Sequence, residues 1–88
     1  MISQKDIIKM YKGKRFDESD PHSTISTISF YSDKAVLMSG KYIRGQSGYY
    51  VEAVIDRNTG QNLTPRRTRP AESKADAIDV AEEMLMEE

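Results

Sequence analysis

The sequence contains no cysteine, a single histidine and no long apolar run. Without cysteine the chain cannot form disulfides or thiolate-bound zinc and iron-sulfur sites, and nothing in it requires an oxidising compartment. No segment approaches the ~20 apolar residues that span a bilayer, and the first residues reach a charge too early for a signal peptide. We therefore expect a cytoplasmic protein that is not bound to a membrane.

Residues with catalytic or metal-binding chemistry are also scarce. His22, the only histidine, lies in the polar segment 17–23, and a neighbouring serine and aspartate in a loop do not make a catalytic triad. One histidine with scattered acids does not form a metal site. The glycines near Lys41 and Arg44 lack the spacing of a phosphate-binding loop. We therefore expect a protein that is not an enzyme, with no cofactor, metal or small-molecule substrate.

The length of 88 residues fits one small domain over residues 1–88. A chain of this size buries only about 60 to 65% of the surface that its unfolded form exposes. An apolar content of 38% with 31% charged residues is sufficient for folding but predicts a thin core. A homodimer would supply additional burial.

Two helices are predicted from capping signals and apolar spacing. Ser3, followed by Asp6, predicts a helix from residue 3 or 4 to 12, and Gly13 is suited to end it in a left-handed conformation. Ser73, followed by Asp76, predicts the start of a second helix. Its apolar stripe is Ala77, Ile78, Ala81, Met84 and Leu85, whereas Val80 and Met86 lie outside that stripe.

The residues between these helices predict an antiparallel sheet. Strands are expected at 24–31, 35–44 and 49–56. In the last of these, Tyr49, Val51, Ala53 and Ile55 alternate with more polar residues and predict one apolar face. A fourth strand at 61–68 would be restricted to an edge by Pro65. The expected fold is a two-layer α+β domain in which a three- or four-stranded meander is covered by the C-terminal helix, with a short N-terminal helix.

Charge is divided along the chain. Residues 1–70 hold twelve Lys and Arg against seven Asp and Glu, a net charge of +5, whereas residues 71–88 hold one lysine against seven acids, a net charge of -6. A basic body can attract polyanions, and an acidic helix can serve a cationic partner or a second copy.

The first functional hypothesis is a non-catalytic nucleic-acid-binding accessory protein. Cations and aromatics alternate around the predicted 35–56 hairpin, arginines follow it, and stacking on tyrosine favours RNA. The candidate site is Lys41, Arg44, Tyr50, Arg57, Arg66, Arg67 and Arg69. The alternative is that Tyr42 and Tyr49 belong to the core and the arginines protect an edge strand.

A second basic group follows the first helix. Lys9, Lys12, Lys14 and Arg15 could track a phosphate backbone, or they could simply keep a small surface helix soluble.

The second functional hypothesis is a protein-binding inhibitor of a host nucleic-acid-handling or defence enzyme. It would use the acidic face of the last helix against a basic target. The candidate residues are Glu72, Asp76, Asp79, Glu82 and Glu83.

The order helix, three strands, helix resembles that of double-stranded RNA-binding domains, which implies contact with RNA grooves through the helices. Those domains open the last helix with a lysine cluster, whereas this chain has Glu72, Lys74 and Asp76 there. In size, in its lack of cysteine and in its lack of a catalytic signature, the chain also resembles small phage-encoded host-takeover proteins, among them anti-CRISPR proteins and antitoxin factors. That resemblance implies an inhibitor or antitoxin that occupies a nucleic-acid or protein surface.

Overall fold

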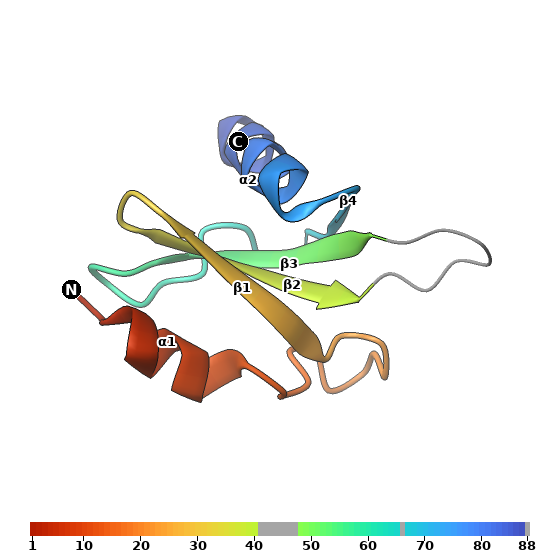
Figure 1. Cartoon of the computed structure of the whole chain (residues 1–88), viewed down its shortest axis with the longest axis horizontal. Coiled ribbons are helices and arrows are strands. Elements are labelled where there is room, and N and C mark those ends of the chain that lie inside the picture. The colour runs from red at the N-terminus through yellow and green to blue at the C-terminus, as the bar shows by residue number, and fades with distance from the viewer. Residues whose placement is uncertain (41–47, 66, 88) are drawn as a thin grey trace.

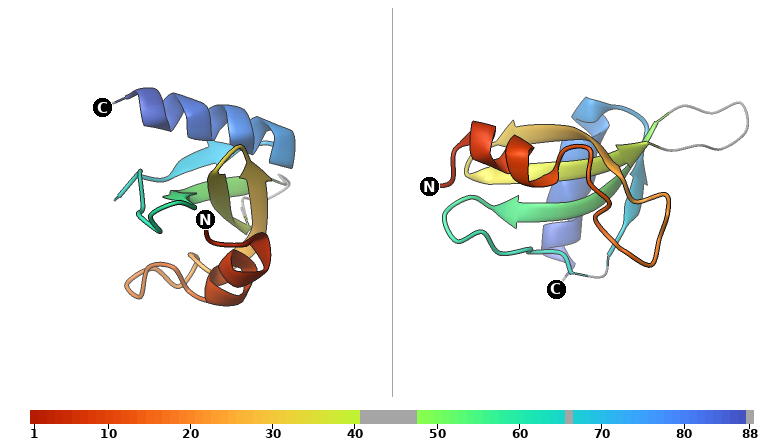
Figure 2. Two further views of the ribbon diagram at one scale, coloured as in Figure 1. Left: turned by 90° about the vertical axis from the view of Figure 1, so that its left-hand side faces the viewer. Right: turned by 90° about the horizontal axis from the view of Figure 1, so that it is seen from below.

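The computed structural model describes residues 1–40, 48–65 and 67–87. The elements in chain order are α1 (Gln4–Tyr11), β1 (Ile25–Tyr31), β2 (Lys34–Gly40), β3 (Tyr49–Asp56), β4 (Arg69–Ala71) and α2 (Lys74–Met86) (Figure 1). The strands form one antiparallel sheet in the order β1-β2-β3-β4. Helix α2 packs on one face of this sheet, and α1 lies on the opposite side (Figures 1 and 2). The predicted α+β fold with a meander and a covering C-terminal helix is confirmed.

Both helices begin at the predicted caps. The Ser3 hydroxyl accepts a hydrogen bond from the Asp6 backbone N–H at 3.1 Å, and Gly13 has a φ of 80° just after α1. Ser73 caps α2 through the Asp76 N–H at 3.1 Å. Because these side chains satisfy backbone groups that a helix leaves unpaired, they fix where each helix starts.

The buried face of α2 keeps four residues of the predicted stripe, with Leu85 partly buried, and gains Val80. Ala77, Ala81 and Met84 are buried, and Val80, predicted to lie outside the stripe, packs against the same core cluster. Met86 is 83% exposed, as its predicted position off the stripe implies. The contact residues are spaced three and four apart, which is the geometry of a helix lying across a sheet.

The predicted apolar face of β3 is wrong because a β-bulge interrupts the strand. Leu37 pairs with Ala53, but the next residue, Met38, pairs with Val51, so Glu52 has no partner of its own on β2. A bulge of this kind shifts the alternation of side chains by one residue. Val51 therefore belongs to the core cluster under α2, whereas Ala53 belongs to the cluster on the α1 side.

The fourth strand comes later than predicted. It is β4, whose Arg69 and Ala71 pair with Val51 and Tyr49. In the described part of 61–68, pairing with β3 is limited to one isolated bridge, between Asn62 and Ile55. Proline is tolerated at position 70 because β4 is the edge strand of the sheet. Here the backbone N–H that proline lacks is not needed for a hydrogen bond to a neighbouring strand.

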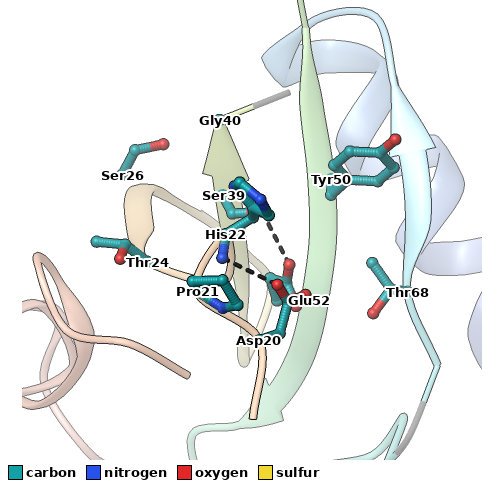
Figure 3. Close-up of a pocket in the computed structure, with 10 residues that line it drawn as sticks. All are labelled: Asp20, Pro21, His22, Thr24, Ser26, Ser39, Gly40, Tyr50, Glu52 and Thr68. Carbon is teal, nitrogen blue, oxygen red and sulfur yellow. Dashed lines mark hydrogen bonds between the residues drawn. The ribbon is translucent and has the colours of Figure 1, made fainter. Parts of the chain in front are cut away.

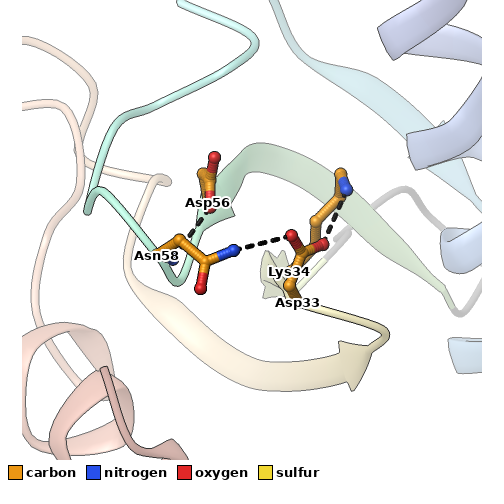
Figure 4. A network of polar contacts seen from close by, with 4 residues as sticks. All are labelled: Asp33, Lys34, Asp56 and Asn58. Carbon is orange, nitrogen blue, oxygen red and sulfur yellow. Dashed lines mark hydrogen bonds and ion pairs between the residues drawn. The ribbon is translucent and has the colours of Figure 1, made fainter. Parts of the chain in front are cut away.

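The predicted 35–44 strand is confirmed as far as Gly40, and the rest of it lies outside the described residues. A network of hydrogen bonds fixes the turn between β1 and β2 (Figure 4). Asp33 accepts hydrogen bonds from Lys34 Nζ and Asn58 Nδ2, each at 2.9 Å, and Asn58 N–H donates to Asp56 at 2.8 Å. These contacts join the β1–β2 turn to the end of β3.

Candidate functional site

Arg57, a member of the predicted basic site, is part of the folded interior. Only 9% of it is exposed. Its Nε donates to the Ile2 carbonyl at 3.0 Å, and its guanidinium lies 5.4 Å from the centre of the Phe30 ring. The side chain therefore holds the N-terminal segment against the sheet, a position with little surface for a phosphate.

The structure brings Arg67 and Arg69 together at the end of α2. Arg67 Nη1 donates to the Met84 carbonyl at 3.0 Å, and Arg69 forms an ion pair with Glu87. Both contacts satisfy groups at the carbonyl end of the helix, where cations are favourable. These two arginines therefore already have partners within the protein.

The other predicted members of this site divide into two sets. Tyr50 lines a pocket, described below. Lys41, Arg44 and Arg66 lie outside the described residues.

A second basic surface, on α1 and the residues after it, is exposed. It consists of Lys5, Lys9, Lys12, Lys14 and Arg15, and we call it the α1 basic surface. None of these side chains takes part in an ion pair or side-chain hydrogen bond within the described residues. Lys5, Lys9 and Lys12 are spaced i, i+4, i+7 and share one helix face, roughly opposite the buried Ile7.

The predicted acidic site on α2 has two kinds of member. Asp76 accepts a hydrogen bond from the Glu72 N–H at 2.9 Å and so takes part in the start of the helix. Asp79, Glu82 and Glu83 are exposed, and the described part of the chain offers them no ion pair. The structure therefore leaves these three carboxylates on the outer face of an ordered helix.

The sheet separates these two charged surfaces. In both orientations α2 lies on one side of the strands and α1 on the other (Figures 1 and 2). At physiological ionic strength, charges separated by more than about 8 Å of solvent are largely screened from each other. A polyanion on α1 would therefore not meet the acidic residues of α2.

A pocket of about 790 Å³ opens on the α1 side of the sheet, between the sheet and the loop that precedes β1 (Figure 3). Its lining residues are Asp20, Pro21, His22, Thr24, Ser26, Ser39, Gly40, Tyr50, Glu52 and Thr68.

The loop that forms one wall of this pocket is fixed by a buried serine. Ser23 is fully buried, its N–H donates to the Asp20 carbonyl, and its hydroxyl accepts from the Asp17 N–H at 2.9 Å. The hydroxyl also lies 2.9 Å from the carbonyl oxygens of Asp17 and Asp20. Although most of this loop is exposed, including His22 as predicted, these bonds give it a defined shape.

Glu52 lies at the floor of the pocket. The bulge in β3 places it there, 9% exposed, and its Oε1 accepts a hydrogen bond from the Ser39 hydroxyl at 2.8 Å. Burial raises the pKa of this carboxyl; the Ser39 bond lowers it, and the nearby Asp20 and Asp17 carboxylates raise it further. The pocket therefore holds a carboxyl group that is poorly stabilised when ionised.

Sequence reasoning missed this pocket. The signal for it is Glu52, a glutamate in the middle of the apolar strand 49–56, at one of the more polar alternating positions. A glutamate is almost never fully buried without a partner, so its position could have marked a special site.

Neither a metal-binding cluster nor a membrane-spanning helix occurs within the described residues. No group of three or more His, Cys, Asp or Glu side chains there is arranged to hold a metal ion. No helix among these residues has the length and apolar character to cross a membrane.

Comparison with known proteins gave no match to any protein-family model, curated protein or solved structure. The resemblances to double-stranded RNA-binding domains and to phage host-takeover proteins therefore stay predictions.

Proposed function

We propose that this is a non-catalytic nucleic-acid-binding protein that contacts phosphates through the α1 basic surface. The observation that carries this proposal is a set of five exposed cations without partners among the described residues, on the side of the sheet away from the acidic helix. Exposed lysine and arginine side chains supply most of the affinity of such proteins by releasing counterions from the phosphate backbone. Arg57, Arg67 and Arg69 of the sequence-based site, in contrast, are held by contacts within the protein.

Exposed apolar side chains beside the lysines support nucleic-acid binding by the α1 basic surface. Ile8 is 40% exposed and Met10 is 46% exposed. Apolar groups next to cations can contact sugars and bases once the phosphates are held. RNA remains the favoured form because Tyr50, at the pocket on the same side, is half-buried and could stack on an unpaired base.

The proposal is tested by titrating the protein, freed of copurifying nucleic acid, against labelled single-stranded RNA, duplex RNA and duplex DNA over a range of salt concentrations. We expect binding that weakens steeply with salt and is tightest for RNA. Lys9→Ala and Lys12→Ala should each reduce the salt slope by about 1.

Lys74→Ala is the matched control, because Lys74 is an exposed lysine at the start of α2. It removes the same charge from the other side of the sheet and should leave the slope unchanged. Equal slopes for all three variants would reject α1 as the contact surface, and the absence of binding to any of the three nucleic acids would reject the function.

A second candidate function rests on Asp79, Glu82 and Glu83 of α2, which are exposed and form no ion pair with the part of the chain that the structure describes. They would oppose a basic protein target, as in an inhibitor of a nucleic-acid-handling or defence enzyme. Charge reversal at Asp79 and Glu83 should slow association with such a target while the fold is kept. Unchanged association rates in a purified complex would reject this surface.

A further inference from the structure

The floor of the pocket presents a carboxyl group that is largely removed from water. Glu52 is 9% exposed, and its Oε1 accepts a hydrogen bond from the Ser39 hydroxyl. The carboxyl group lies at the pocket near Asp20 (Figure 3). Because the protein shields this carboxylate from solvent, a cationic ligand gains more from it than from a fully exposed carboxylate.

The walls add further acceptors and an aromatic ring. Asp20 is held in place because its Oδ1 accepts from the His22 N–H at 2.9 Å. Hydroxyls come from Thr24, Ser26 and Thr68, and the Tyr50 ring lines another side. No lysine or arginine is among the described lining residues. This chemistry disfavours phosphate or carboxylate ligands and favours a cation with several donors.

We infer that this pocket binds a guanidinium group, as in an arginine side chain or a free alkylguanidine. A guanidinium is planar, carries five N–H donors, pairs with carboxylates through two parallel hydrogen bonds and stacks on aromatic rings. Asp20 and Glu52 supply the carboxylates, and Tyr50 supplies the ring. The volume of about 790 Å³ lies within the range of sites for organic ligands and admits a whole arginine side chain.

This inference uses none of the α1 cations, but it shares Tyr50 with the proposed RNA contact, so a guanidinium and an unpaired base would compete for that ring. An alkylammonium is more strongly hydrated than a guanidinium and has only three donors, so it should bind more weakly. A nucleoside carries no positive charge that could pair with the two carboxylates. Guanosine is therefore the negative control for binding to this pocket.

The test is calorimetric titration of the full-length protein with agmatine, 1,4-diaminobutane, guanosine and a capped peptide containing one arginine. Agmatine and 1,4-diaminobutane carry the same charge and differ only in a guanidinium replaced by an ammonium, so we expect saturable binding of agmatine that is tighter than that of 1,4-diaminobutane, and no binding of guanosine. Agmatine and the peptide distinguish the two sources of the ligand. Equal affinities indicate a partner's arginine, and binding of agmatine alone indicates a free small molecule.

Two variants test the assignment of the carboxylates. Glu52→Gln keeps an acceptor for Ser39, and Asp20→Asn keeps an acceptor for the His22 N–H, so both should fold. Each should weaken agmatine binding about tenfold or more, the usual loss for a charged hydrogen bond. Glu18→Gln is the matched control, because Glu18 is an exposed acid on the same loop outside the pocket lining; it should change the affinity less than about twofold.

Three results would overturn the inference. One is the absence of saturable binding by both agmatine and the arginine peptide. Another is tighter binding of guanosine than of agmatine. The third is an equal effect of the Glu52→Gln and Glu18→Gln substitutions in proteins shown to be folded.

Discussion

At the scale of single residues, the same side chain type has opposite roles in different parts of this protein. Arg57 is buried and bonded to the Ile2 carbonyl, whereas Arg15 is exposed and has no side-chain partner among the described residues. The sequence grouped the later arginines into one basic site, but it could not identify which of them the fold would use for internal contacts. That depends on which carbonyl groups the tertiary structure leaves within reach.

Arg57→Ala should lower the free energy of unfolding by about 2 kcal/mol, because it removes a charge-assisted hydrogen bond and a cation–π contact and leaves the Ile2 carbonyl without this donor. Arg15→Ala removes the same side chain from an exposed position and should change stability by less than about 0.5 kcal/mol. Urea unfolding of both variants measures the difference. Similar losses in the two proteins would contradict the structural role of Arg57.

Glu52 should make the stability depend on pH. Its pKa is raised by burial above the ordinary value of 4.5, so the folded state holds this proton more tightly than the unfolded state. The associated stabilisation is complete below the ordinary pKa and is lost as the pH rises through the raised pKa.

The Glu52→Gln variant has no titrating carboxyl group at position 52, so it should not lose this stabilisation as the pH rises. Its free energy of unfolding relative to wild type should therefore increase between acidic and neutral pH. Urea unfolding of both proteins across that range tests the effect. Taking the difference removes the contributions of Asp17 and Asp33, whose lowered pKa values act in the opposite direction in both proteins. Stability curves that stay parallel would contradict the raised pKa.

At the scale of elements, local signals predicted the helices better than the faces of the strands. Ser3 and Ser73 cap their helices as expected because capping depends on residues three apart. The bulge at Glu52 depends on how β3 pairs with β2, and no local pattern in 49–56 encodes that register. The pocket was missed for the same reason, since its floor exists only because of the bulge.

The packing of α2 gives a direct test with two residues of the same type. Met84 is fully buried against the sheet, and Met86 on the same helix is 83% exposed. Met84→Ala should lower the free energy of unfolding by about 2 to 4 kcal/mol, and Met86→Ala by less than about 0.5 kcal/mol. Comparable losses in chemical denaturation would mean that α2 does not dock through this face.

At the scale of the whole molecule, the sheet separates the basic helix from the acidic helix. The sequence showed a basic body and an acidic end, and the structure turns this division along the chain into two sides, with α1 on one and α2 on the other (Figures 1 and 2). Composition alone could not predict that the basic helix and the acidic helix would lie on opposite faces. This separation allows both surfaces to bind partners of opposite charge.

The expected homodimer stays a prediction, for which the two charged surfaces suggest a form. The α1 basic surface of one copy could meet Asp79, Glu82 and Glu83 of another, and such contacts between exposed charges are screened by salt. Sedimentation velocity should then show self-association at low salt that is lost at high salt. Association that is insensitive to salt would exclude this mode of pairing.

The most direct test of the central claim is a map of the amide chemical shifts of the isotope-labelled protein during titration with the nucleic acid it binds most tightly. We predict that the largest changes fall on residues 5–15, with little change at residues 79–83 on the other side of the sheet. Changes centred on α2, or none on α1 at saturation, would contradict the assignment of α1 as the nucleic-acid-binding surface.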